Sequence, residues 1–219
     1  VAMAFLSIKS LRKFDQKTKI IIITNLNFDP GIFKFWNTNK DKLLYFPDSA
    51  INNREYKINI NKYVDSEKVA FFDCDTMILK DINIAWEYLD YFDISLKLNP
   101  SRQKKLGKGD IKILNDKYKV RDLPHFNSGV IFFKKNIVSS EFFEKWCISF
   151  KKKGINYDQV SLVEALFDSR VRILPLTSEW NYFPNSQYYL GKVKTPIILH
   201  YTNRISYVIE DELLQIANL

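Results

Sequence analysis

Residues 68–76 of this chain read KVAFFDCDT, and this stretch indicates the fold more clearly than any other. The apolar run from Val69 to Phe72 is typical of a buried strand, and Asp73 and Asp75 follow it directly. Side chains two residues apart in an extended backbone point to the same side. Because open α/β sheets bind ligands beyond the carboxyl ends of their strands, we expect a ligand at this carboxylate pair. Paired carboxylates there suit Mg²⁺ or Mn²⁺ held together with substrate phosphates.

Apolar runs on both sides of this stretch predict alternating strands and helices. The run KIIIIT at residues 19–24 is continuous and β-branched, which is typical of a strand buried on both faces. Further strands are expected at residues 43–46, 91–96, 130–133, 171–174 and 197–200, and helices at 4–14, 82–89, 140–152, 158–167 and 210–217. We expect Ser139 or Ser140 to cap the helix at 140–152. The alternation predicts an α/β fold, a mostly parallel sheet flanked by helices, as one domain over residues 1–219.

Composition narrows the class of protein. The chain has 219 residues, of which 46% are hydrophobic, so it can bury a sizeable core. Its two cysteines are too few for a disulfide framework and their spacing fits no zinc site. No apolar run approaches the roughly 18 residues of a spanning helix, so we expect no transmembrane segment. A reducing compartment is the default, which favours a cytoplasmic protein and leaves peripheral contact with a membrane surface open.

The net charge of +8 is concentrated in one segment. Residues 97–122 hold nine basic and three acidic residues, and Pro100 with Gly107 and Gly109 favours a loop there. One hypothesis is therefore a non-enzymatic module that binds polyanions through this segment. Tyr118 is its only aromatic residue, which argues against stacking on single-stranded nucleic acid, and we expect no nucleic-acid partner.

A second hypothesis is a phosphatase of the haloacid-dehalogenase type with Asp73 as the nucleophile. Those enzymes carry an Asp-x-Asp-x-Thr motif, whereas Thr76 here follows the second aspartate directly. They also need a later lysine and an acidic pair after a strand, and no such pair follows a later apolar run. Asp73 and Asp75 could also simply cap the next helix.

A third hypothesis rests on a resemblance that covers nearly the whole chain. Residues 68–75 resemble the strand and Asp-x-Asp motif of GT-A glycosyltransferases, and four later segments resemble those of family eight, the glycogenin and bacterial lipopolysaccharide galactosyltransferase type. These segments are Phe126-Asn127-Ser128-Gly129, Tyr157-Asp158-Gln159, Glu179-Trp180-Asn181-Tyr182 and Leu199-His200-Tyr201. Five short motifs in the family's order are more specific than any one of them.

The resemblance implies a role for each matching residue. Asp73, Asp75 and His200 would bind the divalent ion, and the imidazole ligand favours Mn²⁺ over Mg²⁺. Asp158 would bind donor hydroxyls, and Gln159 would lie near the anomeric carbon. The remaining nucleotide-sugar contacts implied are Cys74, Asn127, Ser128, Gly129, Thr24, Arg204 and Arg54, with Lys57 in place of Arg54 if the spacing requires it.

The resemblance also implies the reaction. We expect transfer of a sugar from a nucleoside-diphosphate donor, with UDP as the expected nucleotide, to a hydroxyl acceptor with retention of configuration. Residues 97–122 would lie on the acceptor side and could recognise an acidic or membrane-linked acceptor. The family opens with a strand that holds the base and ribose, whereas this chain opens on the following helix. Either that strand is absent here, within a minimal core or one module of a longer protein, or Thr24-Asn25-Leu26 takes a larger share of base recognition than is usual in the family. Arg204 stands near the place of the family's diphosphate-binding lysine.

Overall fold

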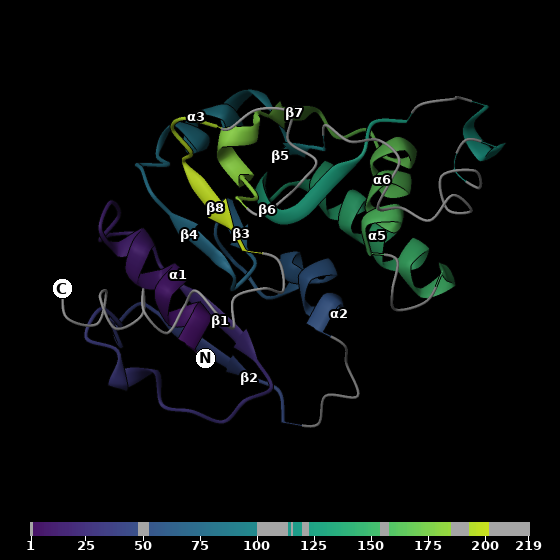
Figure 1. The fold of residues 1–219 in the computed structure, drawn as a ribbon. Coiled ribbons are helices and arrows are strands. Elements are labelled where there is room, and N and C mark those ends of the chain that lie inside the picture. The colour runs from purple at the N-terminus through teal and green to yellow at the C-terminus, as the bar shows by residue number, and fades with distance from the viewer. Residues whose placement is uncertain are drawn as a thin grey trace.

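A computed structural model describes residues 2–47, 53–99, 114, 116–119, 123–153, 158–184 and 193–201 (Figure 1). Its helices are α1 (Ala2–Arg12), α2 (Asn53–Ile58), α3 (Ile84–Tyr91), α5 (Ile137–Lys153) and α6 (Asp158–Asp168), with short 3₁₀ helices η1 (Pro30–Ile32), η2 (Ile60–Lys62) and η3 (Ser178–Asn181). Its strands are β1 (Ile21–Thr24), β2 (Lys42–Tyr45), β3 (Lys68–Phe72), β4 (Thr76–Ile78), β5 (Ile94–Leu98), β6 (Phe126–Lys134), β7 (Ile173–Leu176) and β8 (Ile198–His200). The expected helix at 210–217 lies outside these residues.

The central sheet has four strands in the order β3-β6-β5-β7. Strand β6 runs antiparallel to both β3 and β5, and only β5 and β7 are parallel in this sheet. Two smaller sheets pair β1 with β2 in parallel and β4 with β8 antiparallel. The α/β prediction is confirmed, but the expected predominance of parallel pairs is wrong for the described strands. An apolar run predicts burial of a strand without stating the direction of its neighbour.

Strand β6 lies at the centre of the core because both of its faces are covered. Ile131 and Phe133 pack with α5 and α6, while Val130 and Phe132 pack on the other side with α1, α3 and η3. All four side chains are fully buried. This alternation on a strand covered on both sides explains why the sequence reads as a continuous apolar run. By contrast, β1 is only half-buried, so its expected burial on both faces is wrong.

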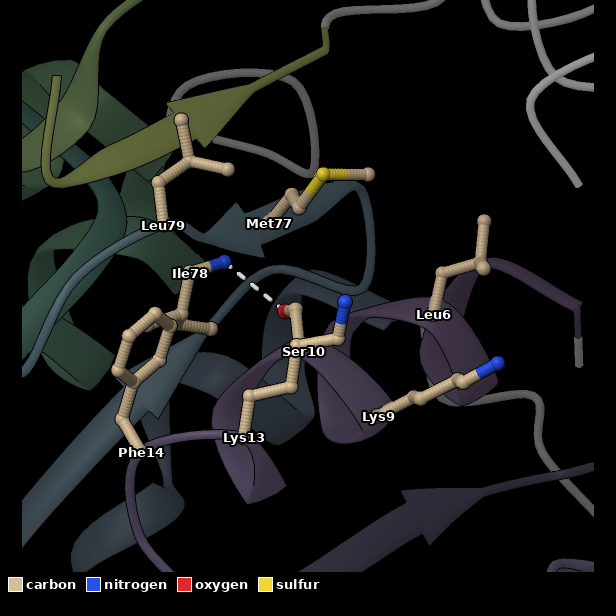
Figure 2. Close-up of a pocket in the computed structure, with 8 residues that line it drawn as sticks. All are labelled: Leu6, Lys9, Ser10, Lys13, Phe14, Met77, Ile78 and Leu79. Carbon is tan, nitrogen blue, oxygen red and sulfur yellow. Dashed lines mark hydrogen bonds between the residues drawn. The ribbon is translucent and has the colours of Figure 1, made fainter. Parts of the chain in front are cut away.

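Helix α1 is anchored to the chain segment that follows β3. The Ser10 hydroxyl accepts the backbone amide of Ile78 at 2.9 Å, and the Ser7 and Thr76 hydroxyls are 3.1 Å apart. Figure 2 shows the first of these bonds beside a hollow of about 180 Å³ between α1 and β4, which contains none of the predicted site carboxylates. The predicted opening helix is thus confirmed, and it buttresses β4.

Helix α5 begins earlier than expected and has a different cap. The Asn136 side chain accepts the Ser139 amide at 2.8 Å, and the Ser139 hydroxyl accepts the Asn136 amide at 3.0 Å. This reciprocal pair closes the N-terminus of the helix, so Asn136 is the cap in place of Ser139 or Ser140.

Within the described part of the chain, no helix combines the length and the apolar character that crossing a bilayer requires.

Glu164 joins α6 to its neighbours, and its charge should stabilise the fold. Its carboxylate accepts from Lys117 Nζ at 2.7 Å, from Lys153 Nζ at 2.6 Å and from the Ser149 hydroxyl. Burial alone would raise the pKa of Glu164, but these hydrogen bonds outweigh it and lower the pKa to about 2. A carboxylate with a lowered pKa stabilises the fold above its unfolded-state pKa and loses that effect as pH falls towards the folded value.

Replacing Glu164 by glutamine should therefore cost about 1 to 3 kcal/mol of unfolding free energy at pH 7. The difference from wild type should shrink below about pH 4 and vanish near pH 2. Denaturant melts across this range measure it, with Glu144→Gln as the control, because Glu144 is exposed on α5. A Glu164→Gln deficit that is equal at pH 3 and pH 7 would contradict the assignment.

Candidate functional site

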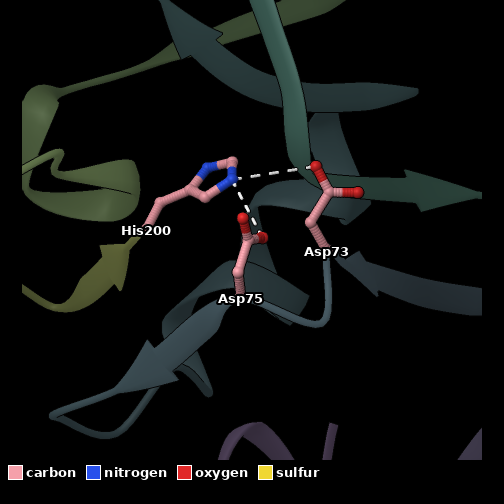
Figure 3. Close-up of side chains that lie close together, drawn as sticks. All are labelled: Asp73, Asp75 and His200. Atoms are coloured by element: carbon pink, nitrogen blue, oxygen red, sulfur yellow. Dashed lines mark ion pairs between the residues drawn. The ribbon is translucent and has the colours of Figure 1, made fainter. Parts of the chain in front are cut away.

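Three ligand-type side chains converge beyond the end of β3. Asp73 follows β3, Asp75 precedes β4, and His200 ends β8, which pairs with β4 so that Thr76 lies opposite His200. His200 Nε2 lies 3.2 Å from Asp75 Oδ1 and 3.8 Å from Asp73 Oδ2 (Figure 3). One ligand atom from each of the three residues fits within 4.8 Å of the others. The sequence-predicted metal ligands therefore meet in space.

The turn that carries the two aspartates is held by its own backbone. The Asp73 amide donates to the Gly129 carbonyl at 2.8 Å, which continues the β3–β6 pairing by one residue. The Thr76 amide and hydroxyl both donate to the Asp73 carbonyl, at 3.1 and 2.8 Å. Cys74, between the aspartates, is exposed. Desolvation and the two flanking carboxylates raise the pKa of its thiol.

His200 is buried and closely surrounded. Its ring is 4% exposed and lies 4.6 Å, centroid to centroid, from the Phe183 ring. Its Nδ1 is 2.8 Å from Asn181 Oδ1, which leaves Nε2 facing the carboxylates. A Cβ atom on Gly129 would come within 2.1 Å of His200 Cε1, so no other residue fits there without displacing the ring. The glycine of one predicted motif thus makes room for the histidine of another.

A second group of charges surrounds Asp73 and Asp158. Lys57 Nζ, on α2, lies 2.8 Å from Asp73 Oδ1 and 3.4 Å from the Ser128 hydroxyl. That hydroxyl donates to Asp158 Oδ2 at 3.2 Å, and Arg54 Nε lies 3.4 Å from Asp158 Oδ1. The basic residue that contacts Asp73 is therefore Lys57, the second choice of the sequence reading, while Arg54 pairs with Asp158. Side chains from α2, β6 and α6 converge here.

The remaining predicted residues lie in different places. Gln159 is the second residue of α6, beside Asp158, and is half-buried. Thr24 ends β1, where its hydroxyl accepts the Leu26 amide at 2.9 Å, a contact within its own turn. Arg204 lies outside the described residues.

Lys97 differs most from its sequence reading. The sequence places it in the basic segment 97–122, most of which lies outside the described residues. Lys97 itself is fully buried in β5, where Nζ donates to the Asn181 carbonyl at 2.8 Å and lies 4.3 Å from the centre of the Phe183 ring. Lys97 therefore holds the backbone of Asn181, the residue that contacts His200, and does not belong to an exposed basic surface. A lone lysine in a strand carries no sequence signal for this role, because its partners lie far along the chain.

No protein-family profile and no curated protein sequence matches this chain. Several solved structures do match it. The galactosyltransferase LgtC, in complex with donor and acceptor sugar analogs, matches with a TM-score of 0.65 at 14% sequence identity, over 100% of this chain and 92% of that one. This chain has the GT-A glycosyltransferase fold.

Two other structures share the GT-A fold with this chain. Mouse xyloside xylosyltransferase 1 in its apo form gives a TM-score of 0.62 at 13% identity over 92% of both chains. The glycosyltransferase GlyE of Streptococcus pneumoniae TIGR4 gives 0.63 at 17% identity, over 93% of this chain and 52% of that one. The resemblance found in the sequence motifs is thus confirmed at the level of the GT-A fold.

Proposed function

We propose that this chain is a metal-dependent glycosyltransferase that moves a sugar from a UDP-linked donor to a hydroxyl acceptor. The observation that carries the proposal is the meeting of Asp73, Asp75 and His200 at the carboxyl end of β3. The donor set fits a divalent ion: two carboxylates offer hard oxygens, and His200 offers Nε2 because its Nδ1 is engaged by Asn181. The mixed oxygen and nitrogen set favours Mn²⁺ over Mg²⁺.

A bound Mn²⁺ would supply Lewis-acid neutralisation of the diphosphate charge as the sugar leaves. The chain's own groups would bind and orient the donor. Lys57 presents a positive charge beside Asp73, which would help to bind the diphosphate. Asp158, held by Ser128 and Arg54, would accept hydrogen bonds from donor hydroxyls. The Asn127 side chain bonds the Gly129 amide and the His200 ring lies against Gly129, so these two residues would support the metal site.

We propose retention of anomeric configuration, with Gln159 beside the anomeric carbon. A neutral amide is a poor nucleophile, so Gln159 would stabilise positive charge on the sugar without forming a bond to it. The leaving phosphate would then take the acceptor's proton on the same face of the sugar, so that the chain supplies orientation and charge. The acceptor is a glycan or another hydroxyl compound.

The two other hypotheses from the sequence have weaker support. A haloacid-dehalogenase phosphatase would carry Asp-x-Asp-x-Thr, whereas Thr76 follows Asp75 directly, and the solved structures that match this chain are glycosyltransferases. The polyanion-binding module depended on residues 97–122, and its first lysine, Lys97, is buried.

Incubation with nucleotide sugars tests the proposed function. We expect nucleoside diphosphate to be released from a UDP-sugar in the presence of Mn²⁺, and EDTA to reduce the release by at least about 100-fold. Sugars linked to GDP serve as donor controls, and a generic aryl phosphate as the control for phosphatase activity. Release that is equally fast in EDTA, or hydrolysis of the aryl phosphate in place of the UDP-sugar, would overturn the proposal.

A further inference from the structure

A chain of buried amide groups connects the backbone of β6 to the ring of His200. It runs from the Gly129 amide through the side chains of Asn127 and Asn181 to His200 Nδ1, and each link is 2.8 Å long. We propose that Asn181 is a positioning residue that determines which nitrogen of His200 carries the proton, and so keeps Nε2 free to bind the metal. This inference deepens the proposed function and rests on it for the metal.

The direction of every hydrogen bond in this chain follows from its first donor. The Gly129 backbone N–H can only donate, so the Asn127 atom that it contacts is the carbonyl oxygen Oδ1. That same oxygen is contacted by Asn181, which must therefore present its amide nitrogen Nδ2. The remaining Asn181 atom, Oδ1, can only accept, so His200 Nδ1 must carry the proton.

The proton assignment places a lone pair where the metal would bind. With the proton on Nδ1, a neutral His200 has an unprotonated Nε2, which is the atom 3.2 Å from Asp75 and 3.8 Å from Asp73. A free imidazole favours the opposite tautomer, in which Nε2 carries the proton and cannot bind a cation. The partner of the non-ligating nitrogen commonly sets the tautomer of metal-binding histidines.

Burial and backbone contacts keep Asn181 in this orientation. Asn181 is fully buried, and Asn127 and His200 are 8% and 4% exposed, so water has little access to replace the amide bonds. The Asn181 carbonyl accepts from the buried Lys97 at 2.8 Å. The next residue, Tyr182, bonds through its amide to Ile198 and through its carbonyl to the His200 amide, at 2.9 and 2.8 Å. Asn181 and His200 are thus held on adjoining backbone.

The tautomer can be measured in the metal-free protein, because the chain has only two histidines. In protein labelled with ¹⁵N-histidine, the ring nitrogen shifts distinguish protonated from unprotonated atoms. We expect His200 Nδ1 to give the signal of a protonated nitrogen, because Asn181 Oδ1 can only accept from it. His125→Gln assigns the signals, since it removes only the other histidine. An unprotonated Nδ1 in wild-type His200 would overturn the proposal.

Two substitutions of Asn181 separate positioning from packing. Asn181→Leu removes both side-chain bonds at similar size. Asn181→Asp keeps an acceptor for His200 Nδ1, but it replaces the donor to Asn127 by a carboxylate oxygen and adds a negative charge. We expect the leucine variant to lose the Nδ1 proton signature and to bind Mn²⁺ about 10- to 100-fold more weakly, the range typical of such supporting residues. The aspartate variant should keep the signature and stay within about tenfold of wild type in Mn²⁺ affinity.

The outcomes distinguish this proposal from the proposed function. A leucine variant with unchanged Mn²⁺ affinity, or an aspartate variant that loses the tautomer as fully as the leucine variant does, would contradict the role of Asn181. If the leucine variant does not fold, the wild-type spectrum and the aspartate variant still decide it. Conversely, a protein with the expected tautomer and Mn²⁺ affinity that transfers no sugar would refute the proposed function and leave this inference intact.

Discussion

Replacing Asp75 by alanine should lower UDP-sugar turnover by roughly 10³-fold or more. The bound metal would supply several kcal/mol of charge stabilisation in the transition state, and each loss of about 1.36 kcal/mol slows the reaction tenfold. Asp75 Oδ1 is the carboxylate atom closest to His200 Nε2, at 3.2 Å. Without it, Asp73 and His200 would remain of the three ligands that the described residues bring together. Titration with Mn²⁺, followed by electron paramagnetic resonance, should show weaker binding in parallel with the loss of turnover.

The matched control for this substitution is Asp65→Ala. Asp65 is an exposed carboxylate in the loop before β3, outside the cluster. It should leave Mn²⁺ binding and turnover within about twofold of wild type, since isolated exposed charges contribute little. Turnover by Asp75→Ala at a rate comparable to that of the control would show that the cluster does not hold the catalytic ion.

Replacing Gly129 by alanine should remove Mn²⁺ binding through sterics alone, without touching any ligand atom. The added Cβ would lie 2.1 Å from His200 Cε1 and 2.6 Å from His200 Nδ1, far inside contact distance. Because His200 and β6 are buried, the ring must move and break its bond to Asn181. We expect at least a 100-fold loss of Mn²⁺ affinity and a loss of about 1 to 3 kcal/mol in unfolding free energy, as is usual for overpacked cores.

Gly31→Ala is the control for the glycine substitution. Gly31 lies in an exposed segment, where an added Cβ would meet only the side chain of Asp29 at 2.9 Å. A double variant, Gly129→Ala with His200→Ala, adds a diagnostic. Removing the ring should recover much of the stability lost in Gly129→Ala, because the two sites are coupled by contact, while Mn²⁺ affinity stays low. Additive stability losses would falsify the clash as the cause.

Local patterns predicted the strand-and-carboxylate part of the site. The apolar run of β3 and the spacing of Asp73 and Asp75 act within a few residues, and the structure has both as expected. The meeting of His200 with these aspartates is a contact between distant segments, and only the resemblance to a known family indicated it. The choice between Arg54 and Lys57 could not be made, because it depends on how α2 turns its side chains towards β3.

The polar contacts between distant segments could not be predicted from the sequence. Asn181 belongs to the motif at residues 179–182, but a motif does not indicate its partners. Its bonds reach Asn127, 54 residues earlier, and His200, 19 residues later. Lys97 appeared as one of many lysines, and its burial depends on a carbonyl 84 residues later. Hydrophobic periodicity reports which side chains are buried. It carries no information about the direction of β6 or about pairs of buried amides.

The pairing of β4 with β8 has a consequence for how the protein unfolds. Strand β8 has only three residues. Its partner β4 directly follows the turn with Asp73 and Asp75, and it lies more than a hundred residues earlier in the chain. An ion held by both strands would act as a removable cross-link that closes this long loop. Cross-links that close long loops restrict the unfolded chain most, and a ligand bound only by the folded state adds stability in proportion to the logarithm of its concentration. The same cation would therefore stabilise the pairing of β4 with β8 as well as bind the donor.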